Sequence, residues 1–221
     1  MLGSGSIADY KSGDLYRSFN ACYDRRFYAQ DKRQVTLEKW VLGCKLVLDG
    51  KPFSFERHEY LQEPYSESHP HEVEMKATQL GLTVKAALRS IHGSITGKYP
   101  RGVLYLFPTK TDVTDFSQGR ITPLIADNEG SIAEWIEDTD RANLKQIGAA
   151  FLYLRGMQSR VGLKSVPVDF IVFDELDEAP QASVKMAMER MAHSEVKEWL
   201  KLSNPTLPDY WGFFGSSAVA P

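Results

Sequence analysis

Short apolar runs alternate with helical patterns over most of this chain. The runs at 103–107 and 170–173 are almost continuously apolar, which is typical of strands buried on both faces of a parallel sheet. Apolar residues at three- and four-residue steps from Val84 to Ile95 predict a helix. We also expect strands at 73–75, 149–154 and 196–202, and helices at 112–125 and 181–192. This alternation predicts an α/β fold with a mainly parallel sheet flanked by helices.

The first quarter of the chain has a different pattern. Apolar residues from Leu37 to Leu48 recur on one face, and Thr36 is a favourable N-cap, so we predict a helix from Thr36 to Leu48. Aromatic residues between 15 and 28 recur at similar steps, which indicates core packing. We interpret residues 1–54 as a helical lead-in or lid segment and residues 55–221 as the core domain.

Composition and charge narrow the class of protein. The 221 residues are 43% apolar and 25% charged, which is typical of a globular domain and excludes a disordered or fibrous chain. The formal net charge of −3 gives no overall attraction to nucleic acid, so any contact with DNA must come from a local patch. No apolar run reaches the roughly 18 residues of a membrane span, and we expect a cytosolic protein.

The segment from strand 73–75 into the following helix has the layout of a phosphate-binding loop. Such a loop presents backbone N–H groups at a helix N-terminus, and a threonine there can bind Mg²⁺. Leu82 occupies the position of the usual lysine, but Lys76 at the strand end could fold back over the loop. Alternatively, Gly81 only turns the chain and Lys76 is solvated. The candidate nucleotide-binding residues are Lys76, Thr78, Gln79, Leu80, Gly81, Leu82 and Thr83.

A pair of carboxylates follows the apolar run at 170–173. Asp174 and Glu175 thereby fall at the carboxyl end of a predicted parallel strand, where ligands bind in such sheets. Asp174 is a candidate Mg²⁺ ligand together with Thr83, and Glu175 is a candidate base that orients and deprotonates water. The alternative is an acidic N-cap after an ordinary core strand.

A third motif, at residues 200–206, completes an ordered set. This segment resembles the coupling motif of terminase large subunits. The segments at 52–55 and 60–61 resemble the lead-in of the lambda-type large terminases, 75–81 their variant phosphate loop and 173–177 their acidic strand. The resemblance runs from about Thr36 to Tyr210.

The resemblance implies an ASCE-type P-loop ATPase that uses ATP and Mg²⁺ to drive double-stranded DNA into a procapsid. Its implied partners are DNA, a portal protein, a small terminase subunit and further copies of itself in a ring. The implied location is the host cytoplasm, without a membrane. The family continues into a nuclease domain, but no second acidic cluster is visible here, so we expect no nuclease activity.

The resemblance also implies roles for individual residues. Ser203 and Asn204 would couple hydrolysis to movement, and Tyr60 or Gln62 would contact the adenine. A basic finger acting on a neighbouring subunit is expected about eleven positions before Glu175. The residues at or near that position are Lys164 and Arg160.

Two alternatives stay open at this point. The chain could be a helicase-like P-loop ATPase acting on nucleic acid without packaging, although no further helicase motif is found. It could also be a catalytically weak assembly or DNA-binding module, because Leu82 has no charge to offer a phosphate.

Overall fold

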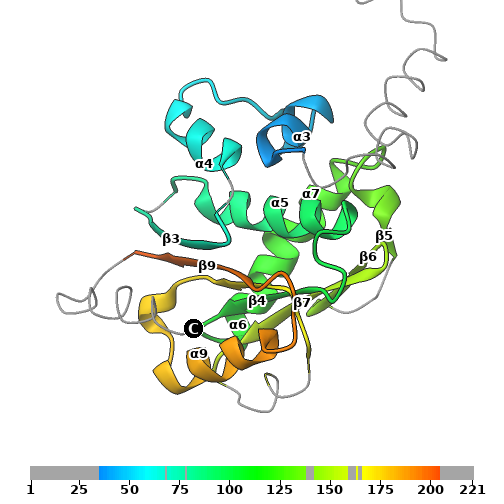
Figure 1. Cartoon of the computed structure of the whole chain (residues 1–221). Coiled ribbons are helices and arrows are strands. Elements are labelled where there is room, and N and C mark those ends of the chain that lie inside the picture. The colour runs from blue at the N-terminus through cyan, green and yellow to red at the C-terminus, as the bar shows by residue number, and fades with distance from the viewer. Residues whose placement is uncertain are drawn as a thin grey trace, which may run out of the picture.

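The structure is a computed structural model that describes residues 35–67, 69–77, 79–137, 142–158, 163 and 166–204. Figure 1 shows a central sheet with helices on both sides. The strands are β1 (Val47–Leu48), β2 (Lys51–Pro52), β3 (His71–Met75), β4 (Val103–Phe107), β5 (Ile136–Glu137), β6 (Leu144–Ile147), β7 (Ala150–Gly156), β8 (Phe170–Phe173) and β9 (Glu198–Ser203). The α-helices are α3 (Leu37–Gly43), α4 (Gln62–Ser66), α5 (Leu82–Ile95), α6 (Lys110–Phe116), α7 (Thr122–Ala126) and α9 (Gln181–Met188). Short 3₁₀ turns (η2, η4, η5, η6) occupy Glu59–Leu61, Ala133–Trp135, Leu176–Glu178 and Glu189–Met191, and a π-helical turn (η3) occupies Ser117–Ile121.

The main sheet has seven described strands in the order β3-β9-β8-β4-β7-β6-β5. Every pairing from β3 to β7 is parallel, and β6 and β5 are antiparallel additions at the far edge. The predicted mainly parallel α/β fold is therefore confirmed. In this order β9 lies between β3 and β8, so the phosphate-loop strand and the acidic strand are one strand apart.

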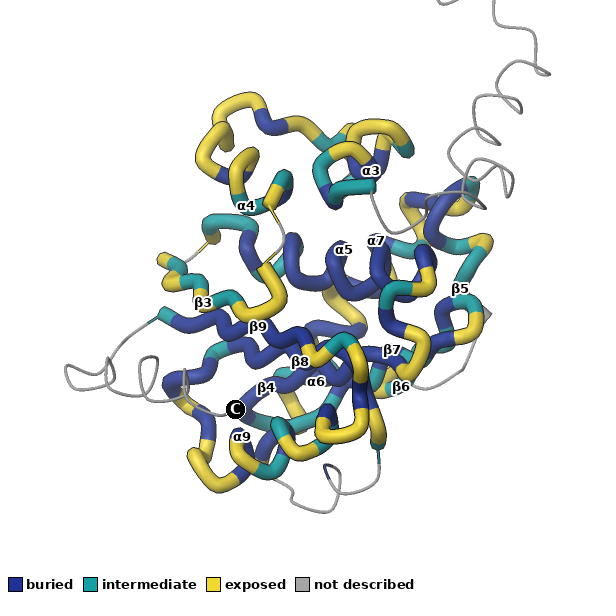
Figure 2. Tube along the Cα trace, viewed as in Figure 1, coloured by how far each residue is buried: buried dark blue, intermediate teal, exposed yellow. Residues whose placement is uncertain are grey.

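Strand β4 shows how the sheet is covered on both faces. Tyr105 and Phe107 join the core cluster that contains residues of α3, α5, α6 and α7. Leu104 and Leu106, which alternate with them, join the cluster that contains residues of α9. Figure 2 accordingly shows the central strands as buried, between the two helical layers.

The N-terminal helix is shorter than predicted. Thr36 is its N-cap, as expected, and its side chain accepts a hydrogen bond from Lys39 N at 3.3 Å. The helix ends at Gly43, however, because the chain then enters a β-hairpin. Lys45 already has a positive φ of 50°, which is incompatible with continuing the helix to residue 48.

The β1–β2 hairpin replaces the predicted last helical turn. Asp49 and Gly50 have φ of 51° and 72°, as the central residues of a tight hairpin require. Asn128 fixes the hairpin to the end of α7: its Nδ2 donates to Val47 O at 2.8 Å and its Oδ1 accepts from Val47 N at 2.9 Å. The hairpin is thereby held beside the end of α7.

The predicted division at residue 54 crosses one continuous core. Trp40, on one side of the division, and Leu88, on the other, belong to the same buried cluster. The boundary itself stays a prediction, and the aromatic pattern at 15–28 lies outside the described residues. Among the helices that the structure describes, none has both the length and the apolar character needed to span a membrane.

Candidate functional site

A turn with left-handed backbone connects β3 to α5. Gln79 and Gly81 have φ of 64° and 80°, and Gly81 is the N-cap of α5. A Cβ on Gly81 would lie 3.2 Å from Leu61 Cδ1, and the positive φ disfavours any other residue there. The turn brings the first N–H groups of α5 to the wall of a cavity, where they can bind an anion. Thr78, also predicted for this loop, lies outside the described residues.

Lys76 is the centre of the charged cluster at this turn. Its Nζ lies 2.8 Å from Thr83 Oγ1, 2.6 Å from Asp174 Oδ1 and 2.9 Å from Glu175 Oε1. Burial alone would lower the pKa of Lys76, but the Asp174 and Glu175 carboxylates outweigh it and raise that pKa above its usual value. The lysine on the strand side of the loop thus lies among the residues predicted to bind metal and activate water.

The Asp174 carboxylate, at the end of β8, accepts a hydrogen bond from a core residue that was not among the predicted site residues. Tyr105, on β4, donates its hydroxyl to Asp174 Oδ2 at 2.9 Å. Burial and the adjoining Asp174 carboxylate raise the pKa of Tyr105 well above its usual value, so it stays a donor. Asp174 is almost fully buried, whereas the Glu175 side chain is 44% exposed. Tyr105 belongs to an apolar run, so the sequence alone offered no signal beyond core packing.

Glu175 has an unusual backbone. Its φ and ψ are 49° and 51°, a left-handed conformation that is uncommon for a residue other than glycine, asparagine or aspartate. Such strain is often found at functional sites, where the surrounding structure enforces it. Here the strained residue lies two positions beyond the end of β8, and its carboxylate contacts Lys76 Nζ at 2.9 Å.

The two predicted coupling residues take different positions at the end of β9. Asn204 lines the cavity. Ser203 is buried and exchanges hydrogen bonds with Asp177: its hydroxyl donates to Asp177 Oδ1, and Asp177 N donates to Ser203 Oγ at 3.0 Å. The Ser203 carbonyl also accepts from Lys76 N at 2.9 Å. Ser203 therefore connects the phosphate-loop strand to the turn after the acidic strand.

The cavity beside this cluster has a volume of about 650 Å³. One part of its wall consists of the charged cluster and the phosphate loop. The other part comes from the hairpin tip, α6 and the π-helical turn, and π-turns often mark functional sites. The lining residues of this second part are Asp49, Asp115, Phe116, Gly119 and Arg120, and Val84 of α5 adjoins them.

Asp49 and Arg120 were not among the predicted site residues. The Arg120 guanidinium lies 3.9 Å from the Asp49 carboxylate, and both side chains are exposed. They come from segments that are distant from the phosphate loop in sequence, so only the folded chain brings them to the cavity.

Tyr60 and Gln62 do not line this cavity. The Gln62 amide donates to Glu38 Oε1 at 3.3 Å, and the Tyr60 hydroxyl donates to Leu80 O at 3.2 Å. The contact of Tyr60 or Gln62 with the adenine stays a prediction, and their position outside the cavity does not favour it.

The remaining predicted site residues are Leu82 of the phosphate loop and the two basic finger residues. Leu82 lines the cavity but is mostly buried in the core, where it serves packing. Lys164 and Arg160, the predicted finger residues, lie outside the described residues.

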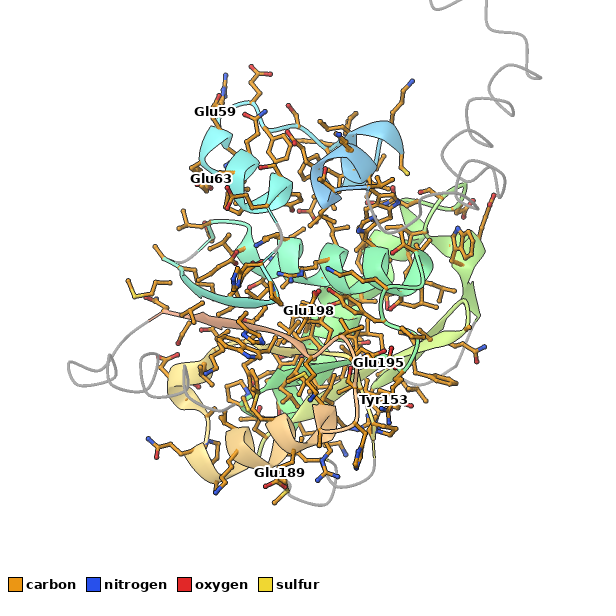
Figure 3. The ribbon with its side chains drawn as sticks, viewed as in Figure 1. Glu59, Glu63, Tyr153, Glu189, Glu195 and Glu198 are labelled. Carbon is orange, nitrogen blue, oxygen red and sulfur yellow. The ribbon has the colours of Figure 1, made fainter. Side chains whose placement is uncertain are left out.

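A second charged cluster lies under the phosphate loop, between α5 and the sheet. Lys85 Nζ contacts Glu72 Oε2 at 3.1 Å and also pairs with Glu74. The Arg89 guanidinium lies 2.7 Å from Glu72 Oε1 and 3.1 Å from Glu198 Oε2. Arg89 thereby links β3 to β9. In Figure 3, Glu198 lies in the interior near these strands, whereas Glu59 and Glu63 lie at the surface.

The parallel sheet, the glycine-led turn into α5 and the acidic strand end define a P-loop-type α/β domain. Residues 48–218 match the family model described as phage terminase large subunit gpA, ATPase domain. Because this match covers most of the chain, the chain belongs to that family.

Two solved structures with a TM-score above 0.5 agree with this fold. The large terminase ATPase domain of Thermus phage P74-26 is similar with a TM-score of 0.52 at 12% identity, over 69% of this chain and 64% of that chain. A point mutant of the same domain, with an arginine replaced by alanine, gives 0.53 at 12% identity, over 72% and 68%. A large terminase from another thermophilic bacteriophage gives 0.46 at 15% identity, over 70% and 40%. The chain thus spans less than two thirds of the first of these structures, and no curated protein matches it.

Proposed function

We propose that this chain binds ATP with Mg²⁺, hydrolyses the ATP to ADP and phosphate, and uses that reaction to drive double-stranded DNA into a procapsid. The observation that carries the proposal is the contact of Lys76 with Thr83, Asp174 and Glu175 at the carboxyl ends of parallel strands. That edge of the sheet is where ligands bind in such folds. Membership of the terminase family supplies the coupling to DNA.

The oxygen atoms of the cluster suit Mg²⁺. Mg²⁺ is usually held by one or two carboxylates, waters and the phosphates of a substrate, and Asp174 with the Thr83 hydroxyl provides such a set. When bound, Mg²⁺ would offset the charge that develops on the phosphates. Tyr105 fixes the second oxygen of Asp174, so the carboxylate is oriented before any ligand arrives.

The remaining groups have distinct tasks in this proposal. The N–H groups at the start of α5 hold phosphate oxygens, and Lys76 supplies the positive charge that Leu82 cannot. Glu175, which is accessible from the cavity, orients a water molecule and takes its proton. Because its carboxylate is the exposed one of the pair, it can meet a water while Asp174 stays buried.

The second part of the cavity wall is the place proposed for the nucleoside. Val84 and Phe116 offer apolar surface there, and Asp49 and Arg120 stand at its polar margin. A smaller adjoining cavity is lined mainly by apolar residues that include Leu48, Ala87 and Leu124. A flat base inserted between the hairpin and α6 would gain apolar contact while the phosphates remain at the loop.

The motor role adds partners and a coupling element. We propose that Asn204 senses the phosphate end of the nucleotide and that Lys164 or Arg160 acts on a neighbouring subunit of a ring. The proposed partners are double-stranded DNA, a portal protein and a small terminase subunit, in the host cytoplasm. Asn204→Ala should then reduce DNA packaging more than basal hydrolysis. A strictly proportional loss of both would place Asn204 in the chemistry instead of the coupling.

Phosphate release with Mg²⁺, measured with and without double-stranded DNA, tests the proposal. Hydrolysis that DNA stimulates, together with packaging into procapsids, supports a packaging motor. Hydrolysis with strand separation but no packaging would favour the helicase-like alternative. No hydrolysis under any of these conditions would favour an assembly or DNA-binding module.

A further inference from the structure

The Lys76 ammonium has no hydrogen-bonding capacity left in this structure. An ammonium group has three N–H donors, and Lys76 Nζ has three oxygen partners: Thr83 Oγ1, Asp174 Oδ1 and Glu175 Oε1. To donate to a phosphate oxygen, Lys76 must give up at least one of them. The position seen here is therefore one of at least two that the proposed chemistry requires.

The partners of Lys76 include the oxygens that the proposed function assigns to Mg²⁺. Asp174 Oδ1 and Thr83 Oγ1 both lie within 2.8 Å of the ammonium. A divalent cation bound to the same two oxygens would occupy the same space and would repel the positive charge of the lysine. The two cations cannot share these ligands.

We infer that Lys76 is an internal competitor of the divalent cation. Lys76 neutralises Asp174 and Glu175 in one state, and moves onto the phosphates when a metal–nucleotide complex takes its place. This inference rests on the proposed metal ligands, but it concerns an event that precedes hydrolysis. A buried carboxylate without an opposite charge beside it is costly, so a positive charge that stays with Asp174 until the metal arrives stabilises the site.

The position of Lys76 suits this exchange. Its backbone is anchored to β9 through the hydrogen bond from Lys76 N to Ser203 O at 2.9 Å, while its side chain spans the space between β3 and β8. Only the side chain has to move. A consequence is that metal and nucleotide bind interdependently, because each one removes an obstacle to the other.

Binding of Mn²⁺ to the full 221-residue chain without nucleotide tests the inference, with electron paramagnetic resonance as the measurement. We expect Lys76→Met to bind Mn²⁺ at least about tenfold more tightly than the parent, because a competing charge-assisted interaction is gone. Lys76→Arg keeps the charge and should stay close to the parent. Lys39→Met, at an exposed position on α3, makes the same change in net charge and should have no effect.

Further variants place the bound metal. Asp174→Asn in the Lys76→Met background should abolish the added binding, and Lys76→Gln provides a second neutral variant if Lys76→Met does not fold. Equal Mn²⁺ affinity of the parent and both neutral variants would overturn the inference, as would an increase that survives Asp174→Asn. Failure of the proposed function would be recognised separately, because the parent chain would then release no phosphate from ATP.

Discussion

Two lysines on either side of the phosphate loop have the same kind of partners, but one is fully buried and the other lines a cavity. Lys76 follows β3 and pairs with Asp174 and Glu175; Lys85, in α5, pairs with Glu72 and Glu74. The Lys85 side chain is 1% exposed, and both of its partners lie on β3 under the helix. Lys76 instead lines a cavity of about 650 Å³.

We expect access to a ligand, and not composition, to separate a structural charge cluster from one that binds a nucleotide. Lys85, Arg89 and their carboxylates hold α5 against β3 and β9, and the cavity beside Lys85 and Arg89 has a volume of about 50 Å³. A buried pair of this kind adds little net stability, but removing one member is costly. The Lys76 cluster has the same ingredients at the open edge of the sheet, so its partners can be exchanged for those of a ligand.

The largest effect is expected for the cluster around Lys76. Glu175→Gln should lower the rate of ATP hydrolysis by about 10²–10⁴-fold, as is typical when a positioned base is lost, and should leave nucleotide binding almost unchanged. Steady-state phosphate release and nucleotide titration measure the two quantities. Glu178→Gln, an exposed glutamate in the next turn, is the matched control. A loss smaller than about tenfold would remove Glu175 from the role of base.

Substitutions in the cluster around Lys85 should lower the stability of the fold. Lys85→Met removes a fully buried charge from its partners Glu72 and Glu74, whose side chains are about 15% exposed, and we expect the free energy of unfolding to fall by about 3 kcal/mol. Lys76→Met should cost less, because Asp174 keeps its hydrogen bonds from Tyr105 and from Glu175 N. Urea unfolding of both variants gives the comparison. Equal losses would show that the two clusters do not differ in the way proposed.

Tyr105 is a buried residue of the core, but its hydroxyl also orients the Asp174 carboxylate in the candidate site. Tyr105→Phe removes one hydrogen bond to Asp174 and should weaken the binding of Mg²⁺–nucleotide by about 10–100-fold, the usual effect of losing a partner behind a metal ligand. The metal dependence of hydrolysis measures this change. Tyr99→Phe, which removes a hydroxyl from the Glu198 cluster instead, should leave the metal dependence unaltered.

The smallest effect is expected at the lead-in. Gln62→Ala should change the KM for ATP by less than about twofold, because an exposed hydrogen bond to Glu38 contributes little. Phe116→Leu, in the proposed nucleoside wall, should raise KM more clearly while leaving kcat similar. If Gln62→Ala raises KM more than Phe116→Leu does, the base binds near the lead-in, as the family resemblance implied.

Much of the site could be predicted because its residues lie at the ends of strongly apolar strands. The run at 170–173 located Asp174 and Glu175, and the glycine-led turn located the start of α5. Lys76 could be proposed because it was the basic residue beside the loop on the strand side. These signals are local in sequence, and the parallel sheet brings them together at one edge.

Other parts of the site depend on contacts that no local pattern records. Tyr105 has the pattern of a core residue, and only the register of β4 beside β8 shows that its hydroxyl reaches Asp174. Asp49 reaches the cavity because a hairpin replaces the expected helical turn. Arg120 reaches it from a π-helical turn at Ser117–Ile121, which interrupts the helix predicted at 112–125.

The position of β9 between β3 and β8 sets the width of the candidate site. Neighbouring strands are about 4.7–4.9 Å apart, so the backbones that carry Lys76 and Asp174 are separated by two such steps, about 9.5 Å. A long side chain is needed to cross that gap, and lysine is long enough whereas a shorter residue is not. Ser203, small and fully buried at the end of β9, occupies the middle of the gap. The end of β9 thus sets the distance between the backbones of Lys76 and Asp174. Any movement that widens or narrows this distance changes whether the Lys76 side chain can reach Asp174.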